Sequence, residues 1–391
     1  MEKTNSIAGI SVNDFIAEAL TSYLEKGFSF SLWRLPNSSV VHMAASEQPV
    51  LLSEVNLEES NSGFLFSPFD PFKDKIHLPL DEYVEFQGGQ IILNKGKIAD
   101  EIISRKSLKS AKRAPYYSLI PPPHSMIDDA YKQLVSKSID EVIRGNFEKI
   151  VPSRFKKLTL PKEFDLVETF HRLCELYPLA MVSVFSSPLT GTWVGATPEM
   201  LVRIDRDQHF HTVAVAGTQS YEAGVDLRSI SWTQKEIEEQ ALVERYIISC
   251  FKKIRLREYD ELGPKTIVAG NVLHLKTEFT VDMVATNFPQ LGSIMLKLLH
   301  PTSAVCGMPL QASLDFLKEN ESYDRQFYSG YLGPVSIKSE TNLYVNLRCM
   351  QLFKNEAILY AGAGVVADSD PEKEWAETEM KMNTLIKSIK K

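Results

Sequence analysis

The chain has 391 residues, of which 44% are hydrophobic and 24% charged, with a formal net charge of -7. This balance excludes a disordered or fibrous protein, because it supplies enough apolar side chains for a large core. It also argues against nucleic acid and anionic membranes as partners, since basic surface drives both kinds of binding. The sequence contains neither a paired-cysteine metal motif nor an apolar run long enough for a signal peptide or a membrane span. We therefore expect a globular, cytoplasmic protein.

The first third of the chain is predicted to combine one helix with the start of an antiparallel meander. The helix would occupy residues 12–27, opened by Ser11 and closed by Gly27, and strand-like segments follow at 28–35 and 40–46. A basic stretch and the triple proline 121–123 come next. Because prolines cannot continue a helix or a central strand, residues 104–124 are interpreted as a crossover between two halves.

The remainder of the chain mixes helices with many short strands. A strong helix is predicted from Ile127 to Arg144, stopped by Gly145 and Asn146, and a strand is predicted at 148–160. Further strands are expected at 179–187, 190–196, 199–205, 209–217, 266–270, 273–281, 343–353 and 356–366. Many strands, with helices in separate runs, predict an α+β protein with large, mostly antiparallel sheets.

A helix near residue 233 carries a carboxylate in an apolar setting. Thr233 and Glu236 fit a capping box, so the helix begins there, and Glu239 lies near the middle of its apolar face. An unpaired buried charge costs several kcal/mol, so Glu239 should be protonated, salt-bridged or bound to a metal. The alternative is that Glu239, in the first turn, simply reaches solvent.

The C-terminal helix places Glu374, Glu377 and Lys381 on one face, beside an apolar stripe. This face is either a solvated one with an ordinary Glu–Lys pair or part of a site that holds a cation and an anion together. With Glu239, it supplies three oxygen donors and no histidine or cysteine cluster. Such hard donors suit Mg²⁺ bound together with an anionic substrate.

Basic side chains that could meet an anion lie on predicted strands. Lys149 would share a face with Val151 and Ser153, and Arg348 would share a face with Tyr344 and Asn346. An arginine can hold a carboxylate bidentately and a desolvated lysine can act as a base, although such residues on edge strands often serve only solubility.

The glycine turn at residues 361–364 imitates a dinucleotide-binding fingerprint, but Asp370-Pro371 breaks the chain where the phosphate-binding helix would run. A new helix is expected to begin near Pro371, which suits the first helical position. What remains is a flexible turn whose N–H groups could bind a carboxylate. A nicotinamide-dependent dehydrogenase is therefore disfavoured.

Many ordered blocks resemble the chorismate-binding enzymes: isochorismate synthases, salicylate synthases and the large subunits of anthranilate and aminodeoxychorismate synthases. They cover about residues 147–385 in the family's order. The blocks are EKIVPSR, GATPEMLVR, VAGT, KEIEEQALV, LHLKT, LHPTSAVCGMP, YSGYLGPV, NLRCM and AGAGVVADSDPEKEWAETEMK. The resemblance implies the family's fold, with helices outside the sheets, over a single domain 1–391. Within it, residues 1–110 would be a divergent half-sheet region and 125–391 the catalytic core.

The resemblance also implies a role for each site residue. Lys149 would be the base that activates water, Glu199 the acid that protonates the departing C4 hydroxyl of chorismate, and His274 a neighbour of the ring. The implied Mg²⁺ ligands are Glu239, Glu374 and Glu377. The implied substrate-binding residues are Gly217, Thr218, Ala304, Arg348, Gly362, Gly364 and Lys381. With both Lys149 and Glu199 present, a catalytically inactive binding module is disfavoured.

Ala304 favours isochorismate synthase, because ammonia-using and lyase relatives usually carry Thr there. Residues 219–221 depart from an arginine that many members carry, which bears on the subfamily. The expected reaction is Mg²⁺-dependent conversion of chorismate to isochorismate, for menaquinone or a catechol siderophore. The alternatives are a salicylate synthase or an anthranilate or aminodeoxychorismate synthase large subunit. We expect a monomer with chorismate as its partner and no obligatory amidotransferase subunit.

Overall fold

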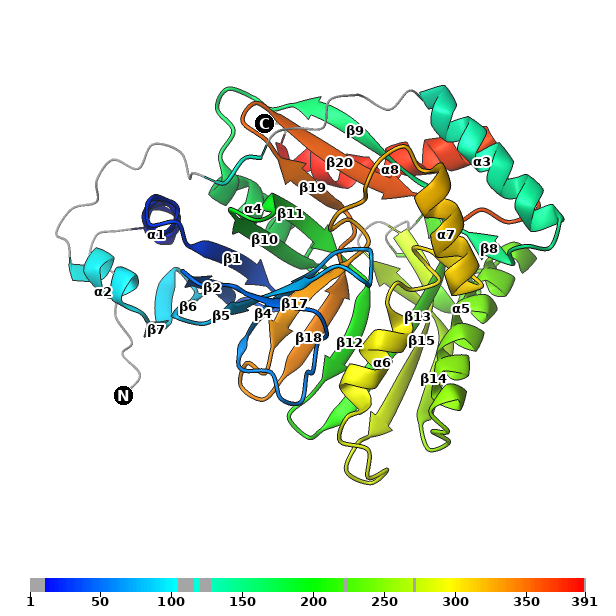
Figure 1. Ribbon diagram of the computed structural model, residues 1–391, viewed down its shortest axis with the longest axis horizontal. Coiled ribbons are helices and arrows are strands. Elements are labelled where there is room, and N and C mark those ends of the chain that lie inside the picture. Colours follow the sequence, from blue (N-terminus) through cyan, green and yellow to red (C-terminus); the bar gives the residue numbers. More distant parts are fainter. Residues whose placement is uncertain (1–10, 105–115, 120–127, 221–223, 270–271, 390–391) are drawn as a thin grey trace.

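Two large antiparallel sheets form the centre of the computed structural model, which describes residues 11–104, 116–119, 128–220, 224–269 and 272–389 (Figure 1). The first sheet, in spatial order, contains β7 (Gln90–Lys95), β6 (Glu82–Gln87), β2 (Val41–Ser46), β1 (Ser29–Arg34), β10 (Met181–Ser187), β11 (Gly191–Thr197), β19 (Cys349–Leu352), β20 (Glu356–Gly362) and β9 (Ser153–Thr159). The second contains β14 (Asp260–Ala269), β15 (Val272–Asp282), β13 (His209–Ser220), β12 (Met200–Ile204), β18 (Thr341–Val345), β17 (Tyr331–Val335), β4 (Gly63–Ser67), β5 (Lys75–Pro79) and β3 (Val50–Leu52). The predicted α+β class is confirmed.

A short third sheet and the helices complete the architecture. The third sheet pairs β16 (Gly307–Met308) with β8 (Lys149–Ile150). The helices are α1 (Val12–Glu25), α2 (Lys97–Ser104), α3 (Asp128–Ile143), α4 (Leu166–Leu176), α5 (Gln234–Lys253), α6 (Leu291–Leu299), α7 (Leu310–Asn320) and α8 (Pro371–Ile389), with a 3-10 turn at Leu227–Ser229. Among the described helices, none is long and apolar enough to cross a membrane.

The core lies in three layers, because each sheet buries both of its faces over part of its width. Helices α1, α4 and α8 pack on the first sheet, and α5 and α6 pack on the second. Between the sheets lies an aromatic layer in which Trp33 meets Phe64, with ring centres 4.9 Å apart, and Phe66 meets Phe185 at 4.5 Å. Strands from the N-terminal third belong to both large sheets, so this region is part of the same scaffold as the rest.

Several predicted element boundaries are confirmed. The Ser11 hydroxyl accepts a hydrogen bond from the Asp14 N–H, so α1 begins where the sequence indicates. The capping box of Thr233 and Glu236 opens α5, and α8 begins at Pro371. The predicted crossover 104–124 falls mostly outside the described residues.

Two predicted strands are wrong as single elements, and both breaks matter for the site. The segment 148–160 divides at Pro152, which lacks an N–H, so that Lys149 lies on β8 and Ser153 on β9. The segment 343–353 divides into β18 and β19, which belong to different sheets. Arg348 lies in the connection with a φ of 46°, so it does not share a strand face with Tyr344 as expected.

Candidate functional site

One cavity of about 1220 Å³ brings together most of the predicted site residues. Its walls come from β12, β13, β15 and β18 of the second sheet, from α5 and α8, and from the loop after β1. The predicted residues that line it are Lys149, Glu199, Gly217, Glu239, His274, Ala304, Arg348, Gly364, Glu374, Glu377 and Lys381. Gly362 does not line the cavity, and the side chain of Thr218 lies outside the described part of the structure.

Lys149 and Glu239 form an ion pair at the inner end of the cavity. The Lys149 residue is only 4% exposed, and its Nζ donates to Glu239 Oε1 at 2.6 Å. The Lys149 ammonium holds the pKa of Glu239 below its usual value. The expectation that Glu239 requires a partner is thus met by a lysine from another element. Gly364 packs against this pair: a Cβ at residue 364 would lie 2.6 Å from Lys149 Cε.

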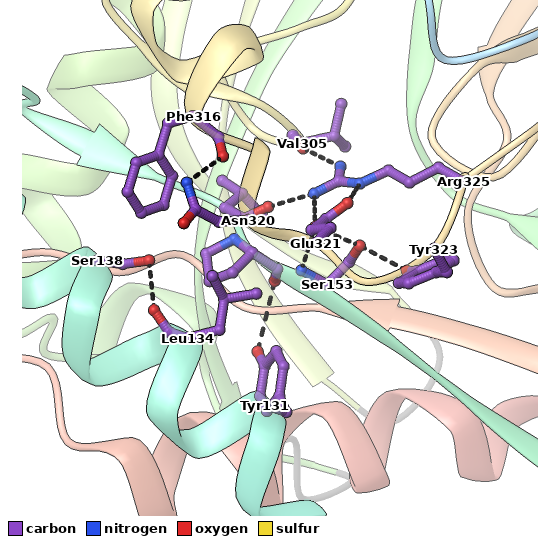
Figure 2. Close-up of polar contacts among 12 residues, drawn as sticks. Tyr131, Leu134, Ser138, Ser153, Val305, Phe316, Asn320, Glu321, Tyr323 and Arg325 are labelled. Carbon is purple, nitrogen blue, oxygen red and sulfur yellow. Dashed lines mark hydrogen bonds and ion pairs between the residues drawn. The ribbon is translucent and has the colours of Figure 1, made fainter. Parts of the chain in front are cut away.

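A buried polar network holds the segment that carries Lys149 (Figure 2). Arg325 pairs with Glu321 and also donates to the main-chain oxygens of Val305 and Val151, at 2.8 and 2.7 Å. Glu321 Oε1 accepts hydrogen bonds from the N–H and hydroxyl of Ser153, both at 2.8 Å. Because Val305 follows Ala304 and Val151 lies near Lys149, one guanidinium ties together two segments of the cavity wall.

Helix α8 contributes two carboxylates and an amine to the same cavity. Lys381 Nζ lies 2.6 Å from Glu377 Oε1 and donates to the Gly362 carbonyl at 2.8 Å, so Gly362 supports the site from behind. Burial alone would raise the pKa of Glu377, but the Lys381 ammonium outweighs it and the net shift is downward. Burial, and then the negative charge of Glu377, raises the pKa of Glu374.

Glu199 and Arg348 face the cavity from the connections between sheets. Glu199 lies between β11 and β12, and its main-chain oxygen accepts from the Val345 N–H at 2.9 Å. Burial raises the pKa of the Glu199 carboxyl, which favours its protonated form. The Arg348 carbonyl accepts from the Ala196 N–H at 3.0 Å, while its guanidinium has no hydrogen bond or ion pair with the described residues. The cavity therefore contains an acid and an unpaired cation.

His274 presents a neutral imidazole to the cavity. Its Nδ1 lies 2.7 Å from the Gly217 carbonyl oxygen, and burial lowers the pKa of the ring. Since a carbonyl only accepts hydrogen bonds, Nδ1 carries the proton and Nε2 is the acceptor atom of the ring.

The carboxylates supply the right atoms for a hard cation, but they are not gathered around one point. Within the described ranges, no three His, Cys, Asp or Glu side chains are close enough to hold a metal ion. Glu239 and Glu377 are each paired with a lysine, and Glu374 is 5% exposed with a raised pKa. Oxygen donors without histidine or cysteine fit Mg²⁺ by donor type. Binding it would require the carboxylates to turn from their lysines.

Some residues that line the cavity were not predicted. The loop after β1 forms part of the wall through Leu35, Pro36, Asn37 and Ser38, none of which was among the predicted site residues. Lys235, an exposed residue in the first turn of α5, also reaches the cavity. The pairing of β1 with β10, which lies far away in the sequence, brings the loop to the cavity. A local sequence pattern does not contain this information.

Comparison with known proteins agrees with this geometry. Residues 90–390 match the model of the chorismate binding enzyme family. The isochorismate synthase EntC of Escherichia coli (strain K12) is 28% identical over 266 residues, an alignment that covers 66% of this chain and 66% of EntC. The structure of MenF, the menaquinone-specific isochorismate synthase from Escherichia coli, superposes with a TM-score of 0.77 at 21% identity, covering 100% of this chain and 94% of MenF. Anthranilate synthase component I from Streptococcus pneumoniae has a TM-score of 0.68 at 17% identity, over 91% and 89% of the two chains. Because the family match spans most of its length, this chain belongs to the chorismate-binding enzyme family.

Proposed function

We propose that this chain is an isochorismate synthase, which adds water at C2 of chorismate and expels the C4 hydroxyl. The observation that carries the proposal is the presence of Lys149 and Glu199 in one cavity, where they would supply a base and an acid. Relatives with the name isochorismate synthase, such as EntC, support the choice within the family. Residues 1–391 would act as one domain, because N-terminal strands contribute to both large sheets.

The acid and the base have separate tasks in this reaction. Lys149 would first give up the ammonium proton that it donates to Glu239 and, as a neutral amine, would then take a proton from the attacking water. Glu199 would give its proton to the departing hydroxyl, and its raised pKa keeps that proton available at higher pH than for an ordinary carboxyl. His274 would lie beside the ring and its hydroxyls. The two proton transfers would thus be carried out by residues from different elements, Lys149 on β8 and Glu199 between β11 and β12.

Positive groups and the glycine turn would bind the substrate carboxylates. The Arg348 guanidinium has no partner within the described residues and can hold a carboxylate bidentately. Lys381 also lines the cavity. Gly217, Thr218, Ala304 and Gly364 would shape the space around the ring. Gly364 has a clear reason to lack a side chain, since Lys149 occupies the position of its Cβ.

Mg²⁺ would be held by Glu239, Glu374 and Glu377, whose oxygen atoms suit it. When bound, the ion would fix a substrate carboxylate and offset its charge. Activity should then be lost with EDTA and restored by Mg²⁺. Glu239→Gln should raise the Mg²⁺ concentration needed for half-maximal rate while leaving the fold intact. Glu238→Gln is the matched control, because that carboxylate lies on the same helix but is exposed and does not line the cavity.

Product analysis tests the proposed reaction. The purified chain alone, given chorismate and Mg²⁺, should form isochorismate reversibly, with no amidotransferase subunit present. Ala304 lies in the cavity wall, where Thr would add a methyl and a hydroxyl close to the substrate. Stoichiometric salicylate and pyruvate on chromatography would assign the chain to the salicylate synthases instead. Anthranilate formed on addition of ammonium would assign it to the anthranilate synthases.

A further inference from the structure

The cavity continues well past the proposed catalytic centre. Along β15 its wall runs from His274 to Thr280, roughly 20 Å at about 3.3 Å per residue. Along β12 it runs from Met200 to Arg203. We call this second end the distal arm; it is lined by Arg203, His211, Thr280, Glu340, Asn342 and Tyr344. A one-ring substrate held by Arg348 would leave this space free.

Three polar side chains meet on one face of two adjacent strands in the distal arm. Arg203 on β12 lies opposite Asn342 on β18, and Tyr344 is two residues further along β18, so the three share a face. Asn342 and Tyr344 are each only 6% exposed. Within the described residues, none of the three side chains has a hydrogen-bonding partner or an ion pair, and Arg203 Nε is buried.

The buried Arg203 Nε in particular needs a partner, because a buried polar atom without one is unfavourable. The neighbouring residues do not supply it. His211 lies opposite Arg203 on β13, but its Nε2 is already engaged with Asp205 Oδ2 at 2.8 Å. Glu340 Oε1 is paired with Arg206 Nε at 2.8 Å. Among the described residues, the Arg203 guanidinium is thus left with a buried, unpartnered nitrogen, and the Asn342 amide and Tyr344 hydroxyl beside it have no hydrogen bond that would prevent them from binding a ligand in the cavity.

The chemistry of this trio selects a ligand class. A guanidinium matches a carboxylate bidentately, and the amide and hydroxyl can bind further polar atoms of the same ligand. Among the described residues that line the distal arm, Arg203 is the cation without an ion pair, and Glu340 lies in the same arm, so a monoanion fits better than a dianion. Leu35 and Pro36 supply apolar wall for a ring. We propose that Arg203, Asn342 and Tyr344 form a second subsite, separate from the catalytic centre, for a small ring compound with a single carboxylate.

Calorimetric titration of the full chain with 4-hydroxybenzoate tests the subsite and requires no turnover, so it stands apart from the proposed activity. Asn342→Asp keeps the side-chain shape but places a carboxylate opposite Arg203, and it should weaken binding at least about tenfold. Tyr344→Phe, which removes one hydroxyl, should weaken binding about three- to tenfold. Arg257→Met removes a positive charge from an exposed residue outside the cavity and should leave the affinity unchanged.

The remaining arms separate this subsite from the catalytic centre. Binding should persist in Arg348→Met, and inorganic phosphate should bind at least about tenfold more weakly than 4-hydroxybenzoate. Thermal melting checks that each variant folds. If Asn342→Asp does not fold, Arg203→Lys replaces it, because lysine keeps the positive charge but cannot donate two parallel hydrogen bonds to a carboxylate. Four results would each overturn the proposal. The first is unchanged affinity for 4-hydroxybenzoate in the variants of Arg203, Asn342 and Tyr344, and the second is loss of binding only in Arg348→Met. The others are no binding at millimolar 4-hydroxybenzoate, and phosphate binding as tightly as 4-hydroxybenzoate.

Discussion

Replacing Gly364 by Ala tests whether the position of Lys149 controls the chemistry. The new Cβ would lie 2.6 Å from Lys149 Cε, 3.1 Å from its Nζ and 3.5 Å from Glu239 Oε1. Carbon atoms normally approach to about 3.5–4.0 Å, so the lysine side chain must retreat by about 1 Å. A displacement of that size in a reacting group can lower a rate by roughly 10²-fold. We expect kcat/KM for chorismate to fall by about this factor, with a loss of about 1–3 kcal/mol in the free energy of unfolding from overpacking.

A double-mutant cycle with Lys149→Ala shows whether the effect passes through the lysine. Truncation of Lys149 removes the atoms that the new Cβ would meet, so Gly364→Ala should then cost much less stability. The coupling should lie in the range of about 0.5–3 kcal/mol that contacting residues show, measured by urea unfolding. If Gly364→Ala keeps wild-type turnover, or if its stability cost is the same in both backgrounds, the reasoning about this contact fails.

Four further predictions concern the charged groups and the proposed Mg²⁺. Glu199→Gln should lower the rate by roughly 10² to 10⁴, and the basic limb of the wild-type kcat/KM profile should be absent from its residual activity. Burial raises the pKa of the Glu199 carboxyl in the folded protein above its ordinary value of 4.5. The stability that the protonated carboxyl contributes is therefore complete below pH 4.5 and is lost as pH rises through the raised pKa. Urea unfolding at a series of pH values should show the wild type losing stability relative to Glu199→Gln over this range. Arg325→Met should cost about 3–5 kcal/mol of unfolding free energy, because it leaves the Glu321 carboxylate buried without its ion-pair partner. The double variant with Glu321→Met should lose less, and a larger loss in the double variant would contradict the ion-pair explanation. Removal of divalent cations by EDTA should abolish turnover, and full activity in a chelated sample would exclude the proposed Mg²⁺.

The elements that could be predicted are those whose signals are local. The capping box of Thr233 and Glu236 determines where α5 begins, and that start sets which face Glu239 occupies. Pro371 likewise defines the start of α8, and the helical period then places Glu377 and Lys381 together. In both cases a few neighbouring residues contain the whole of the information, and the structure agrees.

The parts that could not be predicted depend on contacts between distant segments. The apolar run 343–353 has the composition of one strand, yet it passes from one sheet to the other, and Arg348 takes a positive φ in the connection. That change of sheet brings the guanidinium to the cavity, and alternation along a single strand would have given it the wrong neighbours. The Lys149–Glu239 pair has the same character, because its partners come from β8 and α5, and only tertiary structure joins them.

The charges around the catalytic centre explain why a dication is a reasonable part of the proposal. Four cations face four carboxylates there: Lys149, Lys235, Arg348 and Lys381 against Glu199, Glu239, Glu374 and Glu377. With every group ionised these charges balance, and a substrate with two carboxylates would add two uncompensated negative charges, at several kcal/mol for each one that is buried. Burial raises the pKa values of Glu199 and Glu374, which shows that their surroundings disfavour further negative charge. One divalent cation would offset the two substrate carboxylates, so substrate and Mg²⁺ should each tighten the binding of the other by the same factor.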